Sequence, residues 1–282
     1  MAIKFLVLLV AILAGCNAFP APEAEQDMSI FFEHVDRNAR IVGGTQAANG
    51  AHPHMVALTN GAVVRSFICG GSIITRRTVL TAAHCIAAVV SGNTLSRNLR
   101  GTVGTNRWNS GGVMHAFQRH VIHSSYNANT IKNDIGILHT SANIAMTNAV
   151  RAIVVNYDFI GNGINSRVAG WGRIRAGGAI SANLLQLNTQ TIDGNRCVRD
   201  VASVSASLNM RAPAVDPNVE LCTFHSRNHG TCNGDSGSAL VRLDRNQQIG
   251  IVSWGLPCAL GAPDMFVRVS AYRNWVQTNT LN

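Results

Sequence analysis

The sequence contains little lysine, little acidic charge and few aromatic residues. Only Lys4 and Lys132 are lysines among the 23 Lys and Arg residues, and aromatic residues make up 6% of the 282-residue chain. No Asn-X-Ser/Thr triplet occurs, which excludes N-linked glycosylation. Internal repeats and low-complexity segments are also absent, and beyond the N-terminus no apolar run could span a bilayer. We therefore expect no membrane partner.

Residues 1–18 have the features of a signal peptide. Lys4 precedes the apolar core of residues 5–13, and small residues follow it. Because this core is too short to cross a bilayer, it predicts secretion, with cleavage after Ala18. Residues 13–16 also fit a bacterial lipoprotein signal, so lipidation of Cys16 is an alternative.

Residues 19–40 are acidic and contain Pro20 and Pro22, which indicates a loosely ordered prosegment. Residues 41–282, in contrast, keep 20 of the 23 Lys and Arg residues and 9 of the 14 Asp and Glu residues, a formal charge of +11. Arginine keeps its charge far above the pH at which lysine loses it, so this composition suits an alkaline compartment, with codon bias as the alternative explanation. A basic surface can also bind nucleic acid or acidic glycans. The arginines are scattered without a recognisable module, and we expect no nucleic-acid partner.

The run Gly-Thr-Cys-Asn-Gly-Asp-Ser-Gly-Ser at residues 230–238 predicts a nucleophile turn. Glycine on either side of Asp235 and Ser236 lets backbone amides converge on one point, where they can bind the oxyanion of an acyl-transfer intermediate. Ser236 is the candidate nucleophile, and the amides of Gly234 and Ser236 are the candidate oxyanion donors. Glycine-rich turns that contain serine are common, so partners elsewhere in the chain must decide.

Two further motifs supply such partners. His84 follows a run of β-type apolar residues, and Asp134 directly precedes the apolar run of residues 135–138. A serine hydroxyl needs a base to take its proton, and an imidazole base needs an acceptor on its other nitrogen. Alone, His84 would more often be a structural histidine and Asp134 a strand-edge cap. Together with Ser236 they form the predicted catalytic triad, in the chain order of the chymotrypsin template.

More motifs are distributed over residues 41–282, namely Ile41-Val42-Gly43-Gly44, Cys69-Gly70-Gly71, Ala169-Gly170-Trp171-Gly172 and Ser253-Trp254-Gly255. With the triad they resemble the trypsin and chymotrypsin family of secreted serine endopeptidases, and lepidopteran midgut chymotrypsin-like enzymes most. The resemblance implies an all-β fold of two packed six-stranded antiparallel Greek-key β-barrels with a short C-terminal helix. The barrels are expected at about residues 41–155 and 156–282. Ser270 is a candidate cap of the C-terminal helix, with Tyr272, Trp275 and Val276 on one face.

The resemblance also assigns the cysteines. Six cysteines follow the signal peptide, and counting alone cannot pair them uniquely. An even number in a secreted chain indicates disulfides. The family pattern selects three pairs: Cys69 with Cys85, Cys197 with Cys222, and Cys232 with Cys258.

Arg40 and Ile41 resemble the activation junction of the family. Cleavage there by a trypsin-like enzyme would free an α-ammonium group on Ile41, which by the same analogy inserts beside Asp235 and orders the oxyanion turn. A buried carboxylate is costly unless it is paired, so the new ammonium group can supply what the zymogen lacks.

The expected specificity pocket departs from the pattern of trypsins. Gly230 lies at the pocket floor, where a trypsin has aspartate, which argues against a strict preference for Arg or Lys. Asp264 lies where relatives commonly have glycine and is expected to reach the pocket from its side, as in crab collagenolytic proteases. We predict a chymotrypsin-like preference for large apolar residues with some tolerance of basic ones. The alternative is that Asp264 points into a loop or is neutralised by Thr231 and water. The other expected substrate-binding residues are Thr231, Ser253, Trp254 and Gly255.

We expect no metal and no cofactor. His115, His120 and His123 lie close in sequence, but a surface strand with polar residues explains them. Residues 101–123 contain no Asp or Glu, so the calcium loop of some relatives lacks its oxygen ligands here.

The sequence therefore predicts a monomeric digestive endopeptidase, secreted as a zymogen into the gut lumen. Its expected partners are protein or peptide substrates, an activating trypsin-like protease and protein inhibitors. The alternative is a defence or cascade protease, or a homologue without catalytic activity. No separate regulatory domain precedes Ile41, which favours the digestive role.

Overall fold

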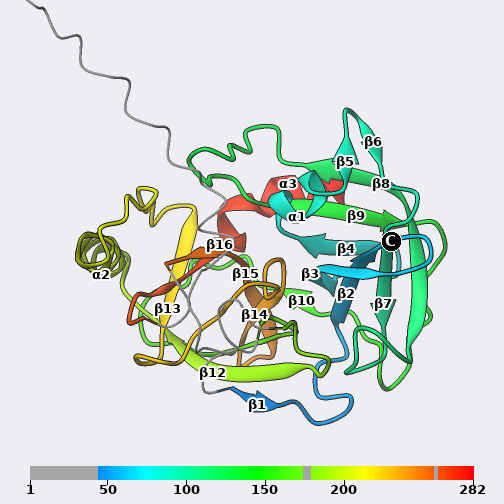
Figure 1. Cartoon of the computed structure of the whole chain (residues 1–282), viewed down its shortest axis with the longest axis horizontal. Helices are drawn as coiled ribbons and strands as arrows, with labels where there is room; N and C mark the ends of the chain where they lie inside the picture. Colours follow the sequence, from blue (N-terminus) through cyan, green and yellow to red (C-terminus); the bar gives the residue numbers. More distant parts are fainter. Residues whose placement is uncertain (1–43, 174–178, 257–259) are drawn as a thin grey trace, which may run out of the picture.

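The computed structural model describes residues 44–173, 179–256 and 260–282 of the chain. Two β-barrels lie beside each other, with few helices around them (Figure 1). The predicted fold class, two six-stranded antiparallel Greek-key barrels with a short C-terminal helix, is confirmed. The predicted signal peptide, prosegment, Arg40–Ile41 junction and Cys258 lie outside the described residues. Within the described part, no helix has both the length and the apolar character needed to cross a membrane.

The first barrel closes in the order β2-β3-β4-β9-β8-β7. Its interior is apolar, and Val56, Leu58, Ile73, Leu80 and Ile137 are almost completely buried there. Removing such side chains from water is the main favourable contribution to the fold. Helix α1 (Ala83–Ala87) and the small ribbon of β5 (Val90–Ser91) and β6 (Thr94–Leu95) follow β4. The barrel strands are β2 (Met55–Asn60), β3 (Ser66–Ile73), β4 (Thr78–Thr81), β7 (Arg100–Val103), β8 (Val113–Ile122) and β9 (Gly136–Thr140).

The second barrel repeats this connectivity without a repeat in the sequence. Its strands run in the order β12-β11-β14-β15-β16-β13, and pairing of β12 with β13 closes it. Strand β1 (Thr45–Gln46) pairs with β12, and β10 (Val154–Val155) runs parallel to β15. Helix α2 (Gly194–Ser207) lies between β12 and β13, and Asp193 caps its N-terminus. The barrel strands are β11 (Asn165–Gly170), β12 (Leu185–Thr191), β13 (Glu220–Phe224), β14 (Ala239–Arg242), β15 (Gln247–Gly255) and β16 (Asp264–Arg268).

The C-terminal helix packs against the first barrel, although it follows the last strand of the second. Tyr272 and Val276 are buried in the apolar core of the first barrel, and Trp275 packs on it. The prediction that Ser270 caps this helix is wrong. Ser270 lies inside the 3₁₀ turn η2 (Val269–Tyr272), and α3 (Arg273–Asn279) follows with Tyr272 as its N-cap. The C-terminal segment thus connects the two barrels.

Candidate active site

His84 and Asp134 meet at the end of β4. His84 lies in the first turn of α1, and its ring Nδ1 is 2.8 Å from Asp134 Oδ2. The backbone N–H of His84 donates to the other carboxylate oxygen, Oδ1, at 2.9 Å. An ionised carboxylate only accepts hydrogen bonds, so Nδ1 carries the ring proton and Nε2 keeps its lone pair. The carboxylate therefore fixes both the orientation and the tautomer that a histidine base requires.

Asp134 is 1% exposed and is also bound by the second barrel. The hydroxyl of Ser253 donates to Asp134 Oδ2 at 2.6 Å. Strand β15 changes its register to β16 between Val252 and Trp254, so Ser253 lies at a β-bulge, a feature that can redirect a side chain. The sequence assigned Ser253 to substrate binding, and its contact with the predicted catalytic carboxylate was missed. No local sequence pattern reports a contact of this kind.

The segment that carries Ser236 belongs to the second barrel and packs against the first. The N–H of Gly70 in β3 donates to the Ser236 carbonyl at 2.8 Å. Gly237 has φ +79°, and a Cβ there would overlap Thr81 Oγ1 and the Gly70 carbonyl. Thr81 ends β4, three residues before His84. The turn around the candidate nucleophile thus lies against the strand that leads to the candidate base, and Ser236 is partly exposed.

The turn before Ser236 has the conformation that its glycine permits. Gly234 has φ +92°, a region that other residues rarely adopt. The N–H of Asp235 donates to the Cys232 carbonyl at 3.0 Å, and the N–H of Ser238 to the Asp235 carbonyl at 3.0 Å. Within the described residues, no hydrogen bond occupies the amides of Gly234 and Ser236. These two amides are the ones expected to bind an oxyanion.

Asp235 is fully buried directly behind the nucleophile turn. Its carboxylate accepts the N–H of Gly172 at 2.9 Å and of Cys232 at 3.0 Å. Burial raises the pKa of Asp235 to about 7, against the lowering effect of these two hydrogen bonds. Among the described residues no cation pairs with this carboxylate. It therefore lacks a positive partner within that part of the chain.

Asp264 begins β16 and lies beside Gly230. A Cβ on Gly230 would be 3.0 Å from both carboxylate oxygens of Asp264. The carboxylate also accepts the backbone N–H of Thr231 at 3.0 Å and its hydroxyl at 2.8 Å. Burial raises the pKa of Asp264 to about 7, and the nearby charge of Asp235 adds to this effect. The carboxyl group thus adjoins the expected pocket floor, is bound by Thr231, and changes charge near neutral pH.

Two of the expected disulfides are present. Cys69–Cys85 joins β3 to α1 beside His84, and Cys197–Cys222 joins α2 to β13. Cys232 is disulfide-bonded as well, while its expected partner Cys258 lies outside the described residues.

Only one group of His, Cys and acidic side chains in the described ranges has ligand atoms close enough for a metal, namely Cys69, His84 and Cys85. The two sulfur atoms form a disulfide, so they are not thiolate ligands. His115 and His120 lie on β8. The ring of His123 packs against Tyr272 and Trp275 at centroid distances of 5.3 and 5.4 Å, so that histidine contributes to the packing of the C-terminal segment.

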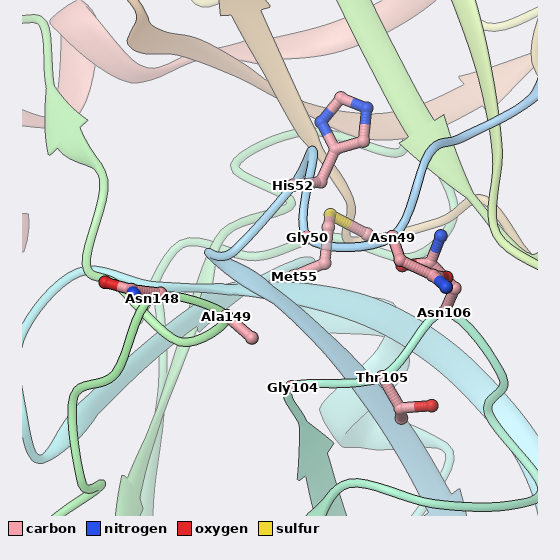
Figure 2. Close-up of a pocket in the computed structure, with 9 residues that line it drawn as sticks. All are labelled: Asn49, Gly50, His52, Met55, Gly104, Thr105, Asn106, Asn148 and Ala149. Atoms are coloured by element: carbon pink, nitrogen blue, oxygen red, sulfur yellow. The ribbon is translucent and has the colours of Figure 1, made fainter.

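A surface cavity of about 570 Å³ lies at the loops of the first barrel (Figure 2). His52 at its edge is held by Gln186, with Nε2 2.7 Å from the amide oxygen. The Asn106 side chain donates to the Ala47 carbonyl at 2.8 Å. None of the described residues that line this cavity belongs to the predicted triad or specificity pocket.

Two Greek-key barrels with a histidine and a buried aspartate at their junction define a class of serine proteases. The sequence profile of the family described as Trypsin matches residues 41–276. The chain belongs to the trypsin family, as the sequence motifs predicted. It is 36% identical to "Trypsin, alkaline B" of Manduca sexta over 249 residues, which cover 86% of this chain and 91% of the relative.

Other relatives carry different names. "Chymotrypsin-2" of Vespa crabro is 33% identical over 242 residues, covering 86% of this chain and 100% of the relative. "Trypsin epsilon" of Drosophila erecta is 31% identical over 242 residues, covering 85% and 87%. Enzymes named trypsin and chymotrypsin are thus similarly related to this chain, so the relatives do not select a substrate preference.

The glycines around Asp235 give a first prediction. A Cβ on Gly170 would overlap the Asp235 carboxylate, whereas a Cβ on Gly161 has no neighbour within 4 Å. Gly170→Ala should therefore lower the free energy of unfolding by about 3 kcal/mol, because overpacking forces backbone shifts in this buried site. Gly161→Ala is the matched control and should change it by less than about 0.5 kcal/mol. Denaturant unfolding measures both, and equal midpoints for the two variants would contradict the packing described here.

Proposed function

We propose that the chain is a secreted serine endopeptidase that hydrolyses peptide bonds through an acyl-enzyme on Ser236. The observation that carries the proposal is the His84–Asp134 hydrogen bond beside the Ser236 turn. His84 Nε2 takes the proton of the Ser236 hydroxyl as its oxygen attacks the scissile carbonyl carbon. The amides of Gly234 and Ser236 stabilise the oxyanion, and His84 then protonates the leaving amine. In the second step His84 takes a proton from water, whose oxygen attacks the ester carbon. The bond to Ser236 then breaks, and His84 returns the proton to the serine oxygen.

A digestive role in an alkaline gut lumen fits the composition and the relatives. The predicted signal peptide and the disulfides suit a secreted protein, because disulfides persist in oxidising compartments. Residues 41–282 carry their positive charge on arginine with a single lysine, and one relative is named an alkaline trypsin. Arginine remains charged in a lumen where lysine begins to lose its proton.

The preferred substrate residue is large and apolar, with basic residues tolerated as pH rises. Gly230 leaves the pocket floor without a charge, and the Asp264 carboxyl group adjoins it. Because burial raises the pKa of Asp264 to about 7, this group is mostly neutral below that pH and mostly charged above it. An arginine side chain therefore gains a charged partner as the pH rises through this range.

The role of Ser236 is tested by its removal. Ser236→Ala should reduce turnover of peptide amides by ~10⁶-fold and abolish labelling by a serine-directed covalent inhibitor, because the nucleophile is gone. Ser238→Ala is the matched control in the same turn and should remain active, since its buried hydroxyl has no hydrogen-bond partner in the described part of the chain. An activated wild-type protein that neither turns over substrate nor reacts at Ser236 would favour a non-catalytic homologue.

Activation is tested at Arg40. Arg40→Gln should prevent cleavage by a trypsin-like enzyme and leave activity at least about 100-fold below that of the cleaved wild type, because Asp235 then lacks the Ile41 ammonium group. N-terminal sequencing and peptide turnover measure the two effects. A variant that is uncut yet fully active would disprove the proposed switch.

The specificity of the pocket is tested at two pH values. In the wild type, the ratio of cleavage after Arg to cleavage after Phe should rise about tenfold between pH 5.5 and pH 9, as Asp264 ionises. Asp264→Gly, and Asp264→Asn as the isosteric control, should keep a low and constant ratio. An Arg-to-Phe ratio in either variant equal to that of the wild type would exclude Asp264 from specificity.

A further inference from the structure

The only lysine and the only glutamate of residues 41–282 form an ion pair with each other. Lys132 Nζ lies 2.9 Å from both Oε1 and Oε2 of Glu220. Lys132 belongs to the first barrel, two residues before Asp134, and Glu220 begins β13 of the second. The Glu220 side chain is 6% exposed and that of Lys132 is 19% exposed. The pair thus crosses between the barrels in a largely buried place.

The same carboxylate holds Trp254. The indole Nε1–H donates to Glu220 Oε1 at 2.7 Å, and the N–H of Asp216 donates to Oε2 at 2.7 Å. Each carboxylate oxygen therefore has two donors. Lys132 Nζ is also 5.6 Å from the centroid of the Trp254 ring, within the range of a cation–π contact. The ion pair thus contacts Trp254 through both of its charged groups.

The backbone on both sides of Lys132 has positive φ values. Ile131 has φ 49° and Asn133 has φ 55°, values that cost energy in residues with a side chain, particularly in β-branched isoleucine. Backbone hydrogen bonds join Lys132 to Asn127, and the Tyr272 hydroxyl donates to the Asn133 side chain at 3.0 Å. The Ile131 side chain packs in the same apolar cluster as Trp254.

On β15, Trp254 lies between one residue that contacts the predicted catalytic Asp134 and one that pairs with the pocket residue Asp264. Ser253, before it, donates to Asp134, and Gly255, after it, pairs with Asp264 across β15 and β16. Ser253, Trp254 and Gly255 are also the residues of β15 that the sequence predicts to bind substrate. We therefore expect the position of the indole to affect binding of the substrate residues that precede the scissile bond.

We propose that Lys132 and Glu220 are positioning residues that hold Trp254 and thereby set the affinity for extended peptide substrates. This inference rests on the proposed endopeptidase function. In this proposal the ion pair acts through Trp254. Within the part of the chain that the structure describes, neither Lys132 nor Glu220 contacts a side chain of the triad. Its loss should consequently affect long substrates more than short ones.

The test compares a blocked single-residue Phe amide with a tetrapeptide amide ending in Phe. Lys132→Met and Glu220→Gln should each lower kcat/KM for the tetrapeptide about tenfold, mainly through KM, and that for the single residue less than about twofold. The double variant should lose no more than the larger single loss, because the two residues act as one unit. Lys132→Arg should retain most of the activity. The control is Arg196→Met, which removes an exposed ion pair on α2 and should change nothing.

Equal losses on both substrates, additive losses in the double variant, or no loss at all would each overturn the proposal. If a single variant fails to fold, Lys132→Arg and the uncharged double variant still provide the comparison of the two substrates.

A second measurement does not need enzymatic activity. In protein labelled with ¹⁵N-tryptophan, Lys132→Met should shift the indole N–H resonance of Trp254, assigned through Trp254→Phe, and leave the other three Trp resonances in place. An unshifted resonance would overturn the positioning role. If the wild type turns over neither substrate, the endopeptidase proposal fails while this measurement still decides whether the ion pair positions Trp254.

Discussion

The junction of the two barrels depends on the buried carboxylate of Asp134. A buried charge is tolerated only when hydrogen bonds and opposite charge replace the water it has lost. The first barrel supplies two of its donors, the ring and the backbone N–H of His84, and the second barrel supplies the hydroxyl of Ser253. These three hydrogen bonds can form together only when the two barrels are in one particular position relative to each other. The geometry of the predicted base is therefore a property of the junction, although His84 and Asp134 both come from the first barrel.

Close backbone approach makes this junction possible. Gly237 lies against Thr81 and the Gly70 carbonyl, and Gly170 and Gly172 lie against the Asp235 carboxylate. A side chain on Gly237 would push the Ser236 turn away from β4. A side chain on Gly170 or Gly172 would displace the Asp235 carboxylate behind that turn. Gly237, one of the glycines that indicated a nucleophile turn, thus also allows that turn to contact the other barrel. The Gly70–Ser236 hydrogen bond and the Lys132–Glu220 pair also join the two barrels.

Short motifs and their order in the chain were enough to predict the candidate triad from the sequence. Contacts between single residues that lie far apart in the chain were not predicted. The histidine, aspartate and nucleophile turn each lie in a recognisable local pattern, and the fold followed from resemblance. Ser253 meets Asp134 across 119 residues, and Lys132 meets Glu220 across 88, through a bulge and a strained loop that leave no periodic signal. The prediction of Ser270 as the helix cap was wrong for a related reason. Tyr272 and Val276 are buried against the first barrel, and this tertiary packing outweighs the local preference of serine for a cap position, so α3 begins after Tyr272.

Electrostatics links the proposed activation to the proposed specificity. Asp235 and Asp264 are both buried, both have a pKa raised to about 7, and the charge of Asp235 contributes to the shift of Asp264. Under the proposed mechanism, the ammonium group released at Ile41 pairs with Asp235 and offsets that repulsion. The pKa of Asp264 then falls, and its charged form, the one that attracts a basic side chain, extends to lower pH. Cleavage of the prosegment would thus order the oxyanion turn and also increase the tolerance of the pocket for arginine. Both effects follow from the buried carboxylate of Asp235, which adjoins the oxyanion turn and acts on the charge of Asp264.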